Sequence, residues 1–309
     1  MPPTLHNTQT IPQWIFAIFF FLPVFSSAQH NFRPIIDMHL HGYTAEEYYG
    51  GSPNPANGIA SPENVEEFRQ SIIELMDRHN IEYAVMSASP EALETFTALD
   101  DRFIPAAQDQ NGLIEITKFE RLVKEGKIRI FGEIMAVYKG LSLSDPVYAP
   151  YLAICEKYDI PVAVHTGTSH PRLAATCCPG YRIEKGNPLH VEEVLVRHPD
   201  LRLYLMHAGT EHYQEALVMM YQFPQLYVDL GALLWIDDFT KHYGVEFLKA
   251  AKSTGMIDRV MFGSDAMVWP GGITKSIEFL ESLDFLSEED KRNIFYHNAA
   301  RFLKLKSDE

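Results

Sequence analysis

Two histidines separated by one residue stand at the end of an apolar run near residue 40, which reads Ile35-Ile36-Asp37-Met38-His39-Leu40-His41. Side chains alternate between the two faces of an extended strand, so we expect Asp37, His39 and His41 on one face and the intervening apolar residues on the other. Two imidazoles on one face, at one strand end, can bind a single zinc ion or a similar divalent ion. Taken alone, the pair could equally be two surface histidines.

Four later apolar runs end in a side chain of the same kind, and these residues are Glu133, His165, His207 and Asp265. Imidazole nitrogens and carboxylate oxygens are zinc ligands, and both groups also transfer protons. The alternatives are structural: Glu133 could pair with Arg129, and either histidine could be a hydrogen-bonded core residue. Asp37 lies one layer deeper, where the expected role is a hydrogen bond to a ligand.

Eight short apolar runs, separated by helical patterns, must bring these residues together: 35–41, 83–89, 103–108, 129–135, 162–166, 201–207, 226–230 and 259–265. Most of the runs are continuously apolar, which is typical of parallel strands covered by helices. No linker or change of composition divides the chain after its N-terminal segment. The pattern therefore favours a single α/β domain with a (β/α)8 TIM-barrel fold over two domains, and in such a barrel the C-terminal strand ends form the active site.

Capping residues predict several helix boundaries. Ser61-Pro62 and Asp145-Pro146 each place an N-cap residue before a proline at the first helical position. Ser287 and Asp290 have the spacing of a capping box, which predicts a last helix from there to about Leu305. Further helical patterns cover residues 112–124, 191–197, 213–221, 245–252 and 273–283.

Two loops are unusually long, residues 42–60 after the first strand and 167–187 after the fifth. Loops of this length are usually functional covers or disordered, and both would lie over the mouth of the barrel. The candidates for substrate binding near the mouth are Lys139, His170, Arg172, Arg182 and Trp235, with Tyr43, Tyr48, Tyr49 and Asp229 as further lining residues. The cationic side chains could bind a substrate carboxylate, although solvated surface charge is the alternative for each.

The composition limits the partners. The chain has 41 acidic and 26 basic residues, a formal net charge of −15, and all of these charges follow residue 28. A general nucleic-acid or anionic-membrane surface would need a basic patch, so we expect a small-molecule substrate instead. The sequence leaves a homo-oligomer open.

Residues 1–28 contain no Lys, Arg, Asp or Glu and include an apolar run from Trp14 to Phe25. This length suits a secretory signal better than a membrane span, and Ser26-Ser27-Ala28 offers small residues for cleavage. We therefore predict a signal peptide over 1–28, an exported periplasmic or secreted protein, and a mature barrel domain over 29–309 without stable membrane insertion. Because the segment lacks a positively charged start, a retained membrane anchor is the alternative.

Three cysteines are too few for a disulfide scaffold. Cys155 lies in a helical pattern and is interpreted as a buried apolar residue. Cys177 and Cys178 are adjacent in a loop, where two free thiols are favoured over a vicinal disulfide, which an oxidising compartment would permit.

In this order, the strand-end motifs resemble those of the amidohydrolase superfamily, in particular its amidohydrolase-related (amidohydrolase 2) branch. The matching segments are Asp37-Met38-His39-Leu40-His41, Gly132-Glu133-Ile134, Val164-His165-Thr166-Gly167, Met206-His207-Ala208-Gly209, Phe262-Gly263-Ser264-Asp265 and Asn298-Ala299-Ala300-Arg301-Phe302-Leu303. The resemblance covers nearly the whole mature chain. Each segment is a weak signal alone, and together they are specific.

The resemblance implies a site for one or two divalent ions, zinc or another metal. His39, His41 and Asp265 match the ligands of the first ion. In single-metal members His165 would complete that shell, and His207 would exchange protons with the substrate. In two-metal members an acidic residue on the fourth strand bridges the ions, and His165 and His207 hold the second. Glu133 occupies the bridging position, where the usual carboxylated lysine is absent.

The expected activity is metal-dependent hydrolysis. A divalent ion lowers the pKa of bound water toward ~7 and polarises a carbonyl, so that activated water attacks a small amide, ester or lactone. Asp265 would accept the proton of that water and deliver it to the leaving group, and His207 would stabilise charge or act as an acid. The resemblance also implies an alternative, a decarboxylase or hydratase of a small aromatic or unsaturated carboxylic acid. A non-catalytic binding barrel would lack ligands, and none is missing.

Overall fold

The computed structural model describes residues 33–305, together with Met1 and Pro3, so almost all of the predicted signal peptide, residues 1–28, lies outside the described residues. Eight parallel strands form one sheet in the order β1 to β8. Their bounds are β1 Ile35–His41, β2 Ile81–Ala88, β3 Phe103–Ala107, β4 Ile130–Ile134, β5 Val162–His165, β6 Leu203–Met206, β7 Leu226–Asp229 and β8 Val260–Met261. Backbone hydrogen bonds from Met38 N to Phe262 O and from Asp265 N to His39 O join the chain after β8 to β1. The predicted (β/α)8 barrel is confirmed.

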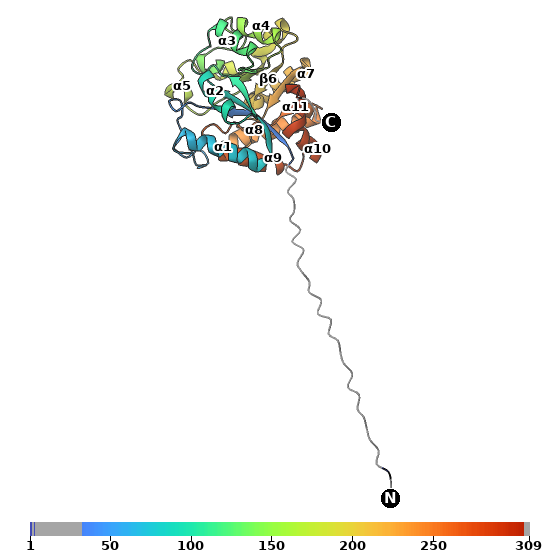
Figure 1. Ribbon diagram of the computed structural model, residues 1–309. Helices are drawn as coiled ribbons and strands as arrows, with labels where there is room; N and C mark the ends of the chain where they lie inside the picture. Colours follow the sequence, from blue (N-terminus) through green and yellow to red (C-terminus); the bar gives the residue numbers. More distant parts are fainter. Residues whose placement is uncertain (2, 4–32, 306–309) are drawn as a thin grey trace. The chain divides into compact units, whose positions relative to one another are not determined.

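Helices alternate with these strands. Within residues 33–305 the α-helices are α1 Val65–His79, α2 Pro90–Leu99, α3 Ile116–Lys124, α4 Ala149–Lys157, α5 Leu173–Thr176, α6 Glu192–Arg197, α7 Tyr213–Gln222, α8 Asp238–Ser253, α9 Gly271–Glu281, α10 Glu288–Arg292 and α11 Asn298–Leu303. They surround the sheet, and α1 lies beside α9 although the two are far apart in the sequence (Figure 1). His79 Nε2 and Thr274 Oγ1 lie 2.8 Å apart across this pair.

Two predicted helix starts are wrong, and a side-chain cap explains the first of them. The Asn64 side chain accepts a hydrogen bond from Glu67 N, so α1 begins at Val65 rather than after Ser61. The Asp145 carboxylate accepts a hydrogen bond from Ser142 N, and α4 begins only at Ala149. In both places the proline lies in the turn that precedes the helix.

Of two further helical segments, α2 was not predicted from the sequence, whereas the start at Ser287 was. Ser89 caps α2 through Ala92 N, a helix that the pattern analysis does not predict because it follows directly on a strand. The predicted capping box at Ser287 is confirmed. From there the chain runs through α10, one π-helical segment at Asn293–His297, and α11.

The strict alternation predicted for β1 is wrong near its C-terminal end. The register between β1 and β2 shifts between Asp37 and Leu40, as at a β-bulge. Ile36 and Met38 pack in an inner apolar cluster, whereas Leu40 packs in the outer layer against the helices. Met38 and His39 are therefore consecutive inward-facing residues. Asp37 faces away from this side, and its Oδ1 accepts a hydrogen bond from His39 N at 3.0 Å.

Two apolar clusters hold the barrel together. The outer cluster lies between strands and helices, and the inner one collects side chains from seven strands together with Phe302 of α11. Arg202, which precedes β6, donates a hydrogen bond to Phe302 O at 2.7 Å, so α11 lies at the N-terminal ends of the strands. The apolar filling therefore occupies that end of the barrel, and the opposite end is left for the polar residues.

Cys177 and Cys178 form a vicinal disulfide, so the prediction of two free thiols is wrong. The backbone N–H groups of both residues donate to Leu173 O, which turns the chain at the end of α5 and brings the two sulfurs together. Cys155 is a buried free thiol, as predicted. Among the described residues, no helix is both long and apolar enough to cross a membrane.

Candidate metal centre

Six side chains converge where the C-terminal ends of β1, β4, β5, β6 and β8 meet. They are His39, His41, Glu133, His165, His207 and Asp265, and none is more than 7% exposed. We call His39, His41 and Asp265 the His39 group, and His165 and His207 the His165 group. The structure thus brings together every residue that the sequence predicted as a metal ligand.

Glu133 lies between the two groups and turns one oxygen to each. Its Oε2 is 3.5 Å from His39 Nε2 and 3.3 Å from His41 Nε2. Its Oε1 is 2.7 Å from His165 Nδ1 and 3.4 Å from His207 Nε2. This is the arrangement that a carboxylate bridging two ions requires, and the Glu133–Arg129 salt bridge considered from the sequence is replaced by these contacts.

Four of the distances among the ligand atoms of the His39 group and Glu133 lie between 3.1 and 3.6 Å. Asp265 Oδ1 lies 3.6 Å from His39 Nε2 and 3.1 Å from His41 Nε2, and Glu133 Oε2 is similarly distant from the same two nitrogens. Four ligands at about 2.1 Å from a zinc ion are roughly 3.4 Å from one another. Among the described residues, His39 Nε2 and Asp265 Oδ1 are buried without a hydrogen-bond partner. These residues therefore fit a divalent ion.

The His165 group is more contracted. His165 Nδ1 is 2.7 Å from Glu133 Oε1, a hydrogen-bond distance, and only 3.0 Å from His207 Nε2. These three atoms also lie close enough together to hold an ion. An ion there would replace the proton between His165 and Glu133.

Buried partners orient two of the imidazoles. Asp229 Oδ2 is 3.1 Å from His39 Nδ1, and Gly231 O is 2.9 Å from His207 Nδ1. Each partner is an acceptor, so each Nδ1 carries a proton, and Nε2 is the ring nitrogen that a metal ion would bind. Asp229 Oδ1 also accepts from the backbone N–H groups of His207 and Gly231. A side chain at Gly231 would collide with His39 Nδ1, so this position has room only for glycine.

The cluster is strongly coupled electrostatically. Burial raises the pKa of Glu133, but hydrogen bonds from His165 and the other histidines outweigh this effect and hold the pKa well below its usual value. Burial lowers the pKa of His41, yet the Asp265 and Glu133 carboxylates raise it to about 9. Burial and the neighbouring His207 lower the pKa of His165. Protons on histidines thus balance buried carboxylates where divalent ions would otherwise do so.

Most of the residues predicted to bind substrate have other contacts. Lys139 Nζ is 2.7 Å from the buried carboxylate of Asp109. Arg182 donates to Pro179 O and Tyr181 O, and Trp235 is buried with its indole N–H donating to Ser264 O. His170 and Arg172 are exposed in the 167–187 loop. None of these five belongs to the groups of ligand atoms described above.

Sequence patterns missed several residues that shape the site. Ser87 Oγ accepts a hydrogen bond from Glu133 N at 3.1 Å. The ring of Tyr138 stands 5.1 Å from that of His165, and its hydroxyl is 2.8 Å from Ser169 Oγ. Asp229 was expected only as a lining residue and instead orients His39. Ser87 and Asp229 lie at the C-terminal ends of β2 and β7, and Tyr138 follows β4, so closeness to a strand end was the available signal.

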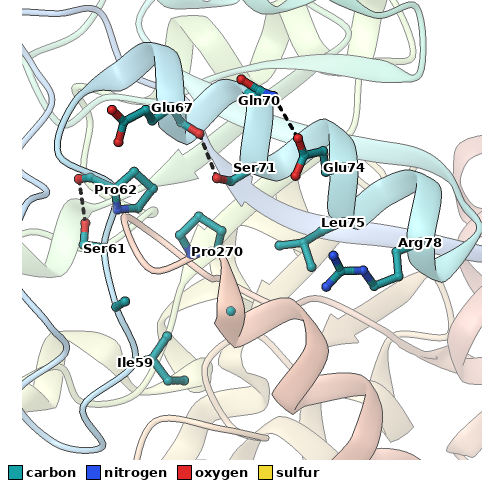
Figure 2. Close-up of a pocket in the computed structure, with 12 residues that line it drawn as sticks. Ile59, Ser61, Pro62, Glu67, Gln70, Ser71, Glu74, Leu75, Arg78 and Pro270 are labelled. Atoms are coloured by element: carbon teal, nitrogen blue, oxygen red, sulfur yellow. Dashed lines mark hydrogen bonds between the residues drawn. The ribbon is translucent and has the colours of Figure 1, made fainter.

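A surface groove lies apart from this centre. It runs between α1, residues 59–62 and the start of α9 at Pro270 (Figure 2). Its α1 side presents Glu67, Gln70, Glu74 and Arg78, with Gln70 bonded to Glu74 within the helix. None of the six converging residues lines it, so the chemistry of the strand ends and this groove are separate features.

Solved structures share this fold at low sequence identity. A TIM-barrel protein from Bordetella bronchiseptica is 19% identical, with a TM-score of 0.62 over 88% of this chain and 98% of its own. A probable 2-pyrone-4,6-dicarboxylic acid hydrolase from Acinetobacter baumannii, with citric acid bound, is 16% identical, with a TM-score of 0.62 over 88% and 99% of the two chains. A 5-carboxyvanillate decarboxylase from Sphingomonas paucimobilis is 12% identical, with a TM-score of 0.59 over 89% and 100%.

Comparison at the level of sequence gives a family assignment. No curated protein sequence matches the chain. The family model described as Amidohydrolase (amidohydrolase 2) matches residues 36–305, a range that contains the eight strands except Ile35, the first residue of β1, and all six converging side chains. The chain therefore belongs to the Amidohydrolase family and is an enzyme of the amidohydrolase superfamily.

Proposed function

We propose that the protein is a metal-dependent hydrolase that uses two divalent ions to cleave a small amide, ester or lactone. The observation that carries this proposal is the position of Glu133, with one oxygen toward each histidine pair. The His39 group, together with Glu133 Oε2, would hold one ion. The His165 group, together with Glu133 Oε1, would hold the other. The imidazole and carboxylate ligands suit zinc, and availability decides among metals of similar preference.

Two residues would move protons or charge during hydrolysis. A bound divalent ion would lower the pKa of a water molecule and polarise a substrate carbonyl. Burial raises the pKa of Asp265, but interactions with His39 and His41 outweigh this effect and lower it, so its carboxylate is ionised and can accept a proton from the attacking water. Asp265 then returns this proton to the leaving group. His207, whose pKa the Glu133 hydrogen bond raises against the effect of burial, balances the charge beside it.

A decarboxylase on the same barrel is the second candidate, because several of the similar structures are named as decarboxylases. That reaction needs only a single ion, which orients the substrate carboxylate. The contact between Glu133 and the His165 group would then bind no ion. We therefore rank hydrolysis first.

The test combines metal analysis with a substrate panel. The purified protein is loaded with Zn²⁺, Co²⁺ or Mn²⁺, and bound ions per chain are counted by elemental analysis. It is then assayed on lactones, anilides and phenyl esters for acid release, and on hydroxylated benzoic acids for CO₂ release. We expect two ions per chain and acid release. One ion per chain with CO₂ release would favour the decarboxylase, and a protein that binds no divalent ion would contradict both.

We also propose that the protein is exported and that residues 1–28 are removed. The charge-free apolar leader supports this proposal, and so does the Cys177–Cys178 disulfide, because disulfides persist mainly in oxidising compartments. To test this idea, cells that produce the protein are separated into cytoplasmic, membrane and exported fractions. Mass spectrometry then determines the N-terminus of the protein in each fraction. An intact N-terminus in the membrane fraction would indicate a retained anchor instead.

A further inference from the structure

Asp109 is a fully buried carboxylate that stands next to the metal centre but outside it. It follows β3 directly, and three donors surround it. Met135 N donates to Oδ1 at 2.6 Å, and Lys139 Nζ and Tyr148 Oη donate to Oδ2 at 2.7 and 2.8 Å. A buried charge is stable only when it is paired and hydrogen-bonded, and these contacts supply both.

These hydrogen bonds connect β3 to the chain of β4 beyond the point where the regular pairing of the two strands ends. β3 pairs with β4 only through Ile130 and Phe131. Beyond that point, Asp109 N donates to Glu133 O at 3.4 Å, and the Asp109 carboxylate binds Met135 N. The backbone that follows the Glu133 side chain is therefore fixed at two points to one residue, Asp109. On the other side Glu133 N donates to Ser87 Oγ.

Lys139 completes this unit. It ends the short 3-10 helix Ala136–Lys139, which follows β4, and its ammonium returns to Asp109. The loop after β4 thus closes around the Asp109 carboxylate. Lys139 is one-third exposed, but its charge balances Asp109 and is not held toward the open mouth for a substrate carboxylate.

We propose that Asp109, with Lys139 and Tyr148, is the positioning unit that presents Glu133 to both histidine groups. This inference rests on the proposed two-ion site, because it assigns Asp109 an effect that is transmitted through Glu133. Asp109 belongs to none of the groups of possible ligand atoms. Loss of its charge should let the turn after β4 move and weaken ion binding that depends on Glu133.

The main experiment is a double-mutant cycle with Asp109→Asn and Glu133→Gln, measured on the full chain by Zn²⁺ titration against a competing chelator. Asparagine keeps the size of the residue but leaves at least one of the three donors without its acceptor. We expect Asp109→Asn alone to weaken the Glu133-dependent ion about 10–100-fold, the range for residues that orient metal ligands. In the Glu133→Gln background the same change should have no further effect. Additive effects in the cycle would overturn the proposal.

A readout without metal separates this inference from the proposed function. In the metal-free protein, amide hydrogen exchange of a peptide covering residues 131–139 should rise in Asp109→Asn and, to a smaller extent, in Tyr148→Phe. The control is Asp145→Asn, whose carboxylate accepts hydrogen bonds from Ser142 later in the same connection between β4 and α4, outside residues 131–139, and which should leave this peptide unchanged. Equal exchange in all variants would overturn the positioning role. A wild-type protein that binds no ion, with exchange as expected, would instead contradict the metal-dependent function alone.

Discussion

The His39 group and the His165 group, on either side of Glu133, offer the same kinds of ligand atom, but the distances between those atoms differ. On one side the His39 group keeps its nitrogens and carboxylate oxygen 3.1 to 3.6 Å from their neighbours, with His39 Nε2 and Asp265 Oδ1 unpartnered among the described residues. On the other side His165 Nδ1 has closed to 2.7 Å from Glu133 Oε1. At the His39 group Asp229 already orients His39, and an ion must displace the proton on His41, whereas at the His165 group an ion must also open the short contact between His165 and Glu133. We expect the first ion to bind at the His39 group.

The largest effect is expected from Asp265→Asn, which removes the proton acceptor while keeping the size of the side chain. We expect kcat/KM for the substrate identified by the panel to fall by about 10²–10⁴-fold, the range for general acid–base groups. Steady-state kinetics on the Zn²⁺-loaded variant measure this effect. Asp258→Asn, an exposed change one turn before β8, is the control and should keep wild-type activity. Full activity in Asp265→Asn would remove Asp265 from the mechanism.

The variant Glu133→Gln tests whether the His39 group and the His165 group bind ions separately. Loss of the carboxylate should weaken the ion at the His165 group by at least about 100-fold, because a neutral amide seldom replaces a bridging carboxylate, while the ion at the His39 group keeps its other ligands. Co²⁺ titration followed by visible absorption counts the two sites separately. If both ions were lost together, the two groups would form one site and the distinction between them would fail.

A smaller effect is expected from Asp229→Asn. The amide can donate where the carboxylate accepts, so the tautomer of His39 is no longer fixed and the first ion should bind about 10–100-fold more weakly. The second ion should be affected less. Chelator competition measures both affinities, and thermal unfolding of the metal-free variant controls for a general loss of structure. An equal loss at both sites would mean that Asp229 supports the whole centre, since it also accepts from His207 N.

The smallest effect is on pH dependence. The Asp265 and Glu133 carboxylates raise the pKa of His41 to about 9 in the metal-free protein, against the effect of burial. Below that pH His41 carries a proton that an ion must displace, so affinity at the His39 group should rise by up to about tenfold per pH unit until the pH reaches the pKa of His41. Calorimetry at pH 7.5 in buffers of different ionisation enthalpy should detect close to one proton released from this residue. Affinity that is independent of pH would contradict this assignment.

Much of the architecture could be predicted from the sequence because the signals are local and repeated. Eight apolar runs separated by helical patterns specify the barrel, and the ligands follow because strand ends in a parallel barrel meet at one edge. The helix start at Val65 could not be predicted from Ser61-Pro62, since the competing cap Asn64 differs only in its three-dimensional contacts. The bulge in β1 also depends on its neighbours, because the strand adjusts to β2 on one side and to the chain after β8 on the other.

Roles that depend on pairing between distant segments were harder to predict. Lys139 looks like a free cation in the sequence, but the residue that neutralises it, Asp109, lies 30 positions earlier and is buried only once β3 and β4 are adjacent. Trp235 was expected at the mouth, but it is buried, and its indole N–H donates to Ser264 O, which is 29 positions later in the chain. The vicinal disulfide depends on the tight turn at the end of α5. In each case the residue type suggested a possible role, but the sequence did not show which distant residue or turn the side chain would contact.

The ligands of the centre begin on the first strand and end after the last, at His39 and Asp265. During synthesis, the chain must therefore be almost fully made, and its two ends brought together, before the His39 group exists. No shorter fragment of the barrel can hold an ion at that group. An ion held by all three residues of the His39 group is thus a record of completed folding.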